Sequence, residues 1–197
     1  MIISVQGSMA VGKTSVVNYL GQKLHEVFVS HEDISPVVTK INQLQLDKDN
    51  YKDYQMIQAL WIDHEISRYG KVADKKVVLM DFGAEEIDFY TRFYPKACGK
   101  DWQLSPQLIN KLKALETCLP DLVIYLDASE SELRQRKQLD KTRRRSFFDF
   151  QLDNLLPIKR DWFLAKDNTI VVDTNAKTLE EVSQEVYMII SKYVSDN

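Results

Sequence analysis

Residues 7–14, near the N-terminus, have the types and spacing of a phosphate-binding loop. Their sequence, Gly-Ser-Met-Ala-Val-Gly-Lys-Thr, fits G-x-x-x-x-G-K-[ST] at every fixed position. The two glycines let the backbone curl so that several N–H groups point into one concavity and bind phosphate oxygens. We expect Lys13 to reach the β- and γ-phosphates of ATP and Thr14 to ligate a bridging Mg²⁺. The predicted nucleotide-binding residues are Gly7, Ser8, Met9, Ala10, Val11, Gly12, Lys13, Thr14 and Ser15.

The sequence on either side of the loop supplies the strand and the helix that this motif needs. Residues 2–5 are a short apolar run rich in β-branched side chains, and residues 15–26 place apolar side chains at helical spacing. A chance match to the motif is expected roughly once per hundred chains of average composition. The flanking pattern favours a true phosphate site over the alternative, a glycine-rich turn without a ligand.

Length, charge and cysteine content narrow the class of protein. The chain of 197 residues suits a single domain spanning 1–197. A net charge of −3 argues against a general nucleic-acid or membrane surface. Two isolated cysteines favour a reducing compartment, and no signal peptide or membrane-spanning run is visible. We therefore expect a cytoplasmic enzyme that takes a small-molecule substrate, and we leave open whether it forms a homodimer.

Acidic residues follow two of the predicted strands. Residues 27–30 precede Glu32 and Asp33, and the buried-strand pattern at 76–81 ends in Asp81. Ligands of open parallel sheets bind at the carboxyl ends of the strands, so these carboxylates are expected beside the phosphate loop, with Asp81 as a second Mg²⁺ ligand. Further strands are predicted at 122–127 and 170–172. With the run at 2–5 they predict an α/β fold of three layers, a five-stranded parallel sheet flanked by helices.

Helical patterns fill most of the chain between the strands. They are predicted at 35–47, 51–69, 84–97, 105–118, 129–139 and 147–165, with a last amphipathic helix at the C-terminus. Between positions 134 and 145 the chain carries seven Lys or Arg residues and one acidic residue. A mobile lid that donates to a transferring phosphoryl group is one interpretation of this cluster, and a solvated basic helix end is the other.

The order of these features resembles the nucleoside and nucleotide kinase group of P-loop proteins, and most of all the deoxynucleoside kinases. That resemblance implies a lid at about 134–147 whose Arg143, Arg144 and Arg145 act in catalysis. It also implies that Glu32 is the base acting on the acceptor hydroxyl, with Asp33 as the rival, and that Gln55 of the Tyr54–Gln55 pair reads a nucleobase. Glu32, Asp33, Gln55 and Asp81 are thus the predicted acceptor-binding residues.

One triplet departs from the family pattern and leaves the acceptor open. The family carries Asp-Arg-Ser or Glu-Arg-Ser after the third strand, whereas this chain has Asp81, Phe82 and Gly83. The arginine near the acceptor hydroxyl is therefore missing. The expected function is transfer of the γ-phosphoryl of Mg-ATP to a hydroxyl acceptor, with a (deoxy)nucleoside favoured. A nucleoside monophosphate, a non-nucleotide alcohol, or an ATP-hydrolysing module without a small acceptor remain alternatives, and GTP is not excluded as donor.

Overall fold

The computed structural model describes residues 1–140 and 147–196, which fold around one five-stranded sheet. All neighbouring strands are parallel, in the order β2-β3-β1-β4-β5. The predicted α/β class and the five parallel strands are confirmed. The strands are β1 (Ile2–Gly7), β2 (Phe28–Ser30), β3 (Val78–Asp81), β4 (Leu122–Asp127) and β5 (Thr169–Asp173).

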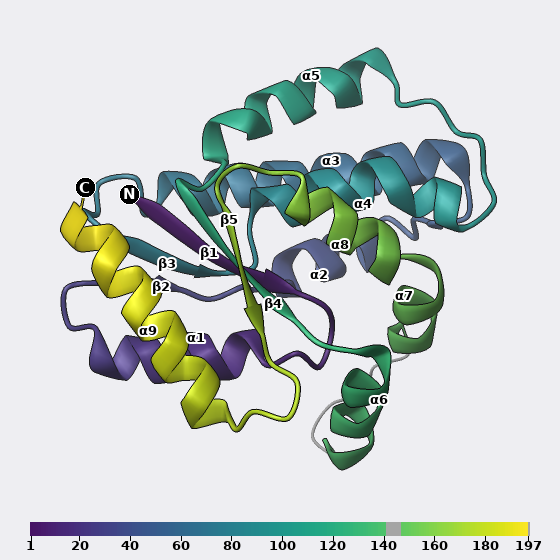
Figure 1. Ribbon diagram of the computed structural model, residues 1–197. Coiled ribbons are helices and arrows are strands. Elements are labelled where there is room, and N and C mark those ends of the chain that lie inside the picture. The colour runs from purple at the N-terminus through teal and green to yellow at the C-terminus, as the bar shows by residue number, and fades with distance from the viewer. Residues whose placement is uncertain (141–146, 197) are drawn as a thin grey trace.

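Helices cover both faces of this sheet (Figure 1). Helices α1 (Lys13–Lys23) and α9 (Leu179–Asp196) pack against one another on one face. Helices α3, α4 and α5 lie together beyond the other face, and α8 lies beside β5. The remaining bounds are α2 (Ser35–Gln43), α3 (Tyr51–Gly70), α4 (Ala84–Ala97), α5 (Pro106–Leu115), a 3-10 turn (Glu116–Cys118), α6 (Glu130–Leu139), α7 (Phe148–Asn154) and α8 (Leu156–Leu164).

The central strand β1 buries apolar side chains on one face and two polar side chains on the other. Ile3 and Val5 are fully buried in the main core beneath α1 and α9. Because side chains alternate along a strand, Ser4 and Gln6 point to the opposite face, where they are equally buried. A strand with buried polar residues next to a phosphate loop indicates that the second face serves more than packing.

Two helix predictions need correction. The single helix expected over 147–165 is two helices, because Pro157 has no N–H to donate to the preceding turn and the chain bends at Leu155 (φ −118°, ψ −27°). The helix expected over 35–47 ends at Gln43, and Gln45 takes a left-handed conformation that a helix does not tolerate (φ 53°). Among the described residues, no helix has the length and apolarity needed to cross a membrane.

Candidate functional site

The loop between β1 and α1 has the backbone geometry of an anion cradle. Gly7 and Gly12 take positive φ angles of 136° and 107°, and a Cβ on Gly7 would lie 2.4 Å from the Leu126 carbonyl oxygen. Helix α1 begins at Lys13 with no side-chain cap and no acidic residue in its first turn. Its first N–H groups and its positive dipole end therefore suit a phosphate. These features fit a bound nucleotide.

Lys13 lies folded onto its own loop in this structure. Its Nζ donates to the Gly7 carbonyl at 2.9 Å and to the Ser8 carbonyl at 3.2 Å. The ammonium therefore stands at the mouth of the cradle, where it is held by neutral oxygens that phosphate oxygens can replace. Thr14 is the next residue of α1 and is partly exposed, so its hydroxyl suits a cation that accompanies the phosphates.

Three side chains from the region around the predicted lid form hydrogen bonds with the backbone of the phosphate loop. Arg136 of α6 donates to the Val11 carbonyl at 3.1 Å, and the Gln151 Oε1 of α7 accepts from the Met9 N–H at 3.0 Å. Lys159 of α8 donates from Nζ to the Gly7 carbonyl at 3.0 Å. Sequence reasoning singled out neither Gln151 nor Lys159, because their contacts join residues more than 140 positions apart.

Lys159 belongs to a fully buried polar cluster. Its ammonium also pairs with the Glu86 carboxylate of α4, and both side chains are inaccessible to solvent. The Gln6 amide, oriented to satisfy both partners, donates to Glu86 Oε2 at 2.6 Å and accepts from the Gly83 N–H at 3.1 Å. Burial lowers the pKa of Lys159 to about 8, although Glu86 acts in the opposite direction. Lys159 is therefore still mostly charged at neutral pH.

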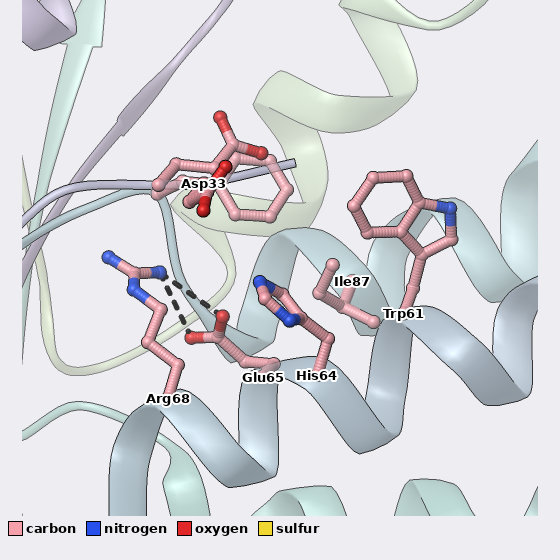
Figure 2. Close-up of a pocket in the computed structure, with 8 residues that line it drawn as sticks. Asp33, Trp61, His64, Glu65, Arg68 and Ile87 are labelled. Atoms are coloured by element: carbon pink, nitrogen blue, oxygen red, sulfur yellow. Dashed lines mark hydrogen bonds and ion pairs between the residues drawn. The ribbon is translucent and has the colours of Figure 1, made fainter. Parts of the chain in front are cut away.

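A cleft next to the phosphate loop is bounded by the ends of β2 and β3 and by helices α3 and α4 (Figure 2). Figure 2 shows Arg68, Glu65, His64 and Trp61 rising from one side of α3, with Asp33 opposite. Its described lining carries three carboxylates and one guanidinium. The lining residues are Glu32, Asp33, Trp61, His64, Glu65, Arg68, Phe82 and Ile87.

The one guanidinium of that lining, Arg68, has its donors occupied. It donates to the Glu65 carboxylate at 3.1 Å and to the carbonyl oxygens of Ser30 and Asp81 at 2.7 and 2.9 Å. Both members of the ion pair are buried. Arg68 thus ties the ends of β2 and β3 together and contributes structure to the floor of the cleft. It does not replace the arginine that is missing from the triplet after β3.

Glu32 and Asp33, left as rivals by the sequence, lie in different environments. Glu32 is an exposed residue overall, but protein atoms crowd its carboxylate, and this loss of solvation raises its pKa to about 7 with help from the Glu86 carboxylate. Asp33 accepts from the Ser35 N–H at 3.0 Å, in the first turn of α2, and this bond lowers the pKa of Asp33. Asp33 is thus engaged by the N–H of the first residue of α2. Glu32 is the carboxyl whose pKa lies near neutrality.

Phe82 occupies the position where the family that the sequence resembles has arginine. Its φ of 69° is unusual for a residue other than glycine, and its ring lines the cleft together with Trp61. Asp81, immediately before it, is buried at the end of β3. The described lining of the cleft thus combines two aromatic side chains with three carboxylates.

Among the predicted acceptor-binding residues that the structure describes, Gln55 and Asp81 are not part of the lining of the cleft. Gln55 accepts from the Ser105 N–H at 2.9 Å, at the start of α5, and is not among the lining residues, while Tyr54 is buried with its hydroxyl on the Tyr90 and Thr91 carbonyls. The proposed contact of Gln55 with a nucleobase therefore stays a prediction. Arg143, Arg144 and Arg145 lie outside the described residues. In the described part of the basic cluster, on α6, Arg134 and Lys137 form ion pairs with α7.

The sheet order and the phosphate loop define a P-loop phosphotransferase of the kinase type. The chain matches no established family profile. It is 26% identical over 204 residues to a probable thymidylate kinase of Archaeoglobus fulgidus, an alignment that covers 99% of this chain and 97% of the relative.

Two solved structures share the fold. Thymidylate kinase from Candida albicans superimposes with a TM-score of 0.71 at 18% identity, covering 100% of this chain and 93% of that one. Deoxyadenosine kinase from M. mycoides gives a TM-score of 0.68 at 13% identity, covering 98% and 100%. The chain thus shares the fold of P-loop kinases, and the likeness does not distinguish monophosphate kinases from nucleoside kinases.

Proposed function

We propose that this protein transfers the γ-phosphoryl group of Mg-ATP to a nucleoside monophosphate. The observation that carries this proposal is the similarity, over nearly the whole of both chains, to a probable thymidylate kinase. It changes the preference drawn from the sequence, which placed the nucleoside first. The residues proposed to bind ATP, the phosphoryl donor, are those predicted from the sequence.

On the donor side, the loop N–H groups and Lys13 bind the triphosphate. Thr14 and the buried Asp81 would hold the Mg²⁺, which would neutralise charge between the β- and γ-phosphates when bound. The α1 N-terminus favours the anion through its dipole. Positioning and electrostatic stabilisation supply most of the catalysis in phosphoryl transfer, and this set of groups provides both. Arg143, Arg144 and Arg145 remain proposed donors to the transferring group.

On the acceptor side, a monophosphate would enter the cleft beside Glu32. Its base would lie against the aromatic surface of Phe82 and Trp61. A phosphate oxygen is already ionised at neutral pH, so the attack needs no base. Because the pKa of Glu32 is about 7, this carboxyl can take up a proton and donate to the incoming phosphate instead of repelling it.

A nucleoside is the second candidate, and the charge of the cleft favours it. The described lining holds three carboxylates, and the guanidinium of Arg68 is already bonded to Glu65 and to backbone carbonyls. A neutral acceptor meets less repulsion there than a phosphate does. In that reaction Glu32, with its pKa near the working pH, would accept the proton of the acceptor hydroxyl.

The experiment that tests the proposal is ADP release from Mg-ATP in the presence of single acceptors, with the product identified by mass. The panel contains the deoxynucleoside monophosphates, the corresponding nucleosides and an unrelated alcohol. A monophosphate should stimulate release and become a diphosphate, and Lys13→Ala should abolish this turnover while the protein stays folded. Stimulation by nucleosides alone would transfer the assignment to the second candidate. ADP release indifferent to every acceptor would refute both.

A further inference from the structure

The carbonyl oxygen of Gly7 accepts hydrogen bonds from two lysines at once. Lys13 reaches it from the start of α1 at 2.9 Å, and Lys159 reaches it from α8 at 3.0 Å. Because both bind one atom, the two ammonium groups are held no farther apart than these two bond lengths combined. Like charges at that separation repel each other strongly where water is excluded. Lys159 is completely buried, whereas Lys13 keeps some exposure.

The two lysines differ in how firmly they are held. Lys159 pairs with Glu86, which is itself held by Gln6, so its ammonium is charge-balanced in place. For Lys13, the bonds recorded in the described structure go to the carbonyls of its own loop, Gly7 and Ser8. Repulsion between the two ammonium groups therefore destabilises the bonds of Lys13 to its own loop, whereas Lys159 stays paired with Glu86.

Binding of a triphosphate requires Lys13 to leave these carbonyls. Gly7 is buried, and a buried carbonyl that loses its hydrogen bond costs free energy. If Lys13 were the sole donor to this oxygen, its departure would leave the carbonyl without a hydrogen bond. The cost of that loss would weaken phosphate binding. With Lys159 in place, the Gly7 oxygen keeps a charged donor throughout.

We propose that Lys159 is a positioning residue of the nucleotide site, which keeps the Gly7 carbonyl hydrogen-bonded and the loop in shape when Lys13 turns to the phosphates. The role rests on the proposed binding of ATP and is independent of which acceptor is used. It assigns a function in donor binding to α8, a helix 152 residues away from Gly7 in the chain.

The first test compares Mg-ATP binding and steady-state kinetics of Lys159→Met with those of the unmodified enzyme. The Kd and KM for ATP should rise by roughly tenfold to a hundredfold, the range for loss of a hydrogen bond to a charged group. The KM for the acceptor should change much less. Lys192→Met removes an exposed lysine on α9 and should change neither constant.

A double variant, Lys159→Met with Glu86→Gln, separates positioning from charge balance. The single variant leaves Glu86 buried without its cation and should lose thermal stability, whereas the double variant has no unpaired charge and should regain much of it. The weak ATP binding should persist in the double variant. Recovery of ATP affinity to the original value would overturn the proposal, as would an equal rise in the KM values of ATP and acceptor.

A third test uses the unmodified protein, so it does not depend on the folding of any variant. Gly7–Ser8 is the one Gly–Ser step in the chain, so carbonyl-¹³C glycine combined with ¹⁵N serine gives a single carbonyl–amide correlation for Gly7. Its carbonyl shift should stay at the hydrogen-bonded position when Mg²⁺ and a non-hydrolysable ATP analogue are added. A shift to the position of a carbonyl without a donor would refute the role of Lys159.

The same experiments separate this inference from the proposed function. If the unmodified protein does not bind Mg-ATP, the proposed function fails before Lys159 is considered. If it binds Mg-ATP and Lys159→Met binds equally well, only the role of Lys159 fails.

Discussion

The pH dependence of the acceptor step distinguishes the two acceptor classes by its sign. The pKa of Glu32 is raised to about 7 by loss of solvation and by Glu86. Roughly nine-tenths of this carboxyl is therefore protonated at pH 6 and one-tenth at pH 8. If protonated Glu32 donates to a monophosphate, kcat/KM for that acceptor falls as pH rises through 7. If ionised Glu32 is the base for a nucleoside hydroxyl, kcat/KM falls as pH drops through 7.

For the monophosphate that we propose, the expected change is large enough to measure directly. When only the protonated form binds well, kcat/KM at pH 8 should be about a tenth of its value on the acidic plateau. The assay is coupled ADP release between pH 5.5 and 9 at saturating Mg-ATP, with the coupling enzymes in excess throughout.

Two variants decide whether Glu32 causes this dependence. Glu32→Gln keeps an amide donor but does not titrate, so its profile through pH 7 should be flat. Asp33→Asn is the matched control, because Asp33 accepts from the N–H of the first residue of α2 and its pKa is lowered, so it stays ionised over this range. A sloped profile that survives in Glu32→Gln, or a flat profile in the unmodified enzyme, would refute the assignment of Glu32.

Three further perturbations test the supporting structure. Gly7→Ala should cost about 1–3 kcal/mol of unfolding free energy in urea from backbone strain alone. It should cost more than Gly12→Ala, because a Cβ at Gly7 meets the Leu126 carbonyl at 2.4 Å while none of the described atoms lies within 4 Å of one at Gly12; equal losses would contradict this. Glu65→Gln leaves Arg68 buried without its counter-ion and should cost about 3–5 kcal/mol, whereas Asp88→Asn in the more exposed pair with Arg92 should cost about 1 kcal/mol or less. A loss in Glu65→Gln no larger than in Asp88→Asn would be inconsistent with a buried pair. Phe82→Ala should raise the acceptor KM about tenfold, since stacking of a base on an aromatic ring is worth about 1–3 kcal/mol, and should leave the KM for ATP nearly unchanged. An equal change in both constants would place Phe82 outside the acceptor site.

The fold was predictable because its determinants are local. The apolar run of β1, the loop glycines and the stripe of α1 stand next to one another in the chain, and each predicts its own element. Two strands with acidic residues at or just after their ends, β2 and β3, predicted where the sheet edge meets the phosphate loop. The error at Leu155 was also local, since Pro157 in the first turn of α8 is a signal for a new helix.

The polar groups behind the loop were not predictable in the same way. Glu86 and Lys159 are charged residues whose burial depends on a partner 73 positions away. A signal existed for Lys159, because it takes a core position on the stripe formed by Leu152, Leu155 and Phe163, all of them buried. A lysine on an apolar stripe calls for a buried counter-ion, but the sequence does not say which carboxylate supplies it.

Gln55 lies outside the described lining of the cleft, so its role toward a nucleobase stays a prediction. The cleft is lined by the later turns of α3, from Trp61 to Arg68, whereas Gln55 lies more than a turn earlier and bonds to Ser105. The Tyr54–Gln55 pair fitted the family by type and approximate place. The side of the helix on which it lies is set by packing against α5, which two adjacent residues do not encode.

The contacts behind the phosphate loop also determine when the loop can be completed during synthesis. Residues 7–14 leave the ribosome among the first, but the groups that fix Met9 and Gly7 are Gln151 and Lys159, 142 and 152 residues later. Contacts of such long sequence separation form late in folding. A nascent chain that ends before α8 therefore carries the whole nucleotide-binding motif without the side chains that hold it in shape. Competence to bind ATP arises near the end of translation, although the motif itself is made at the beginning.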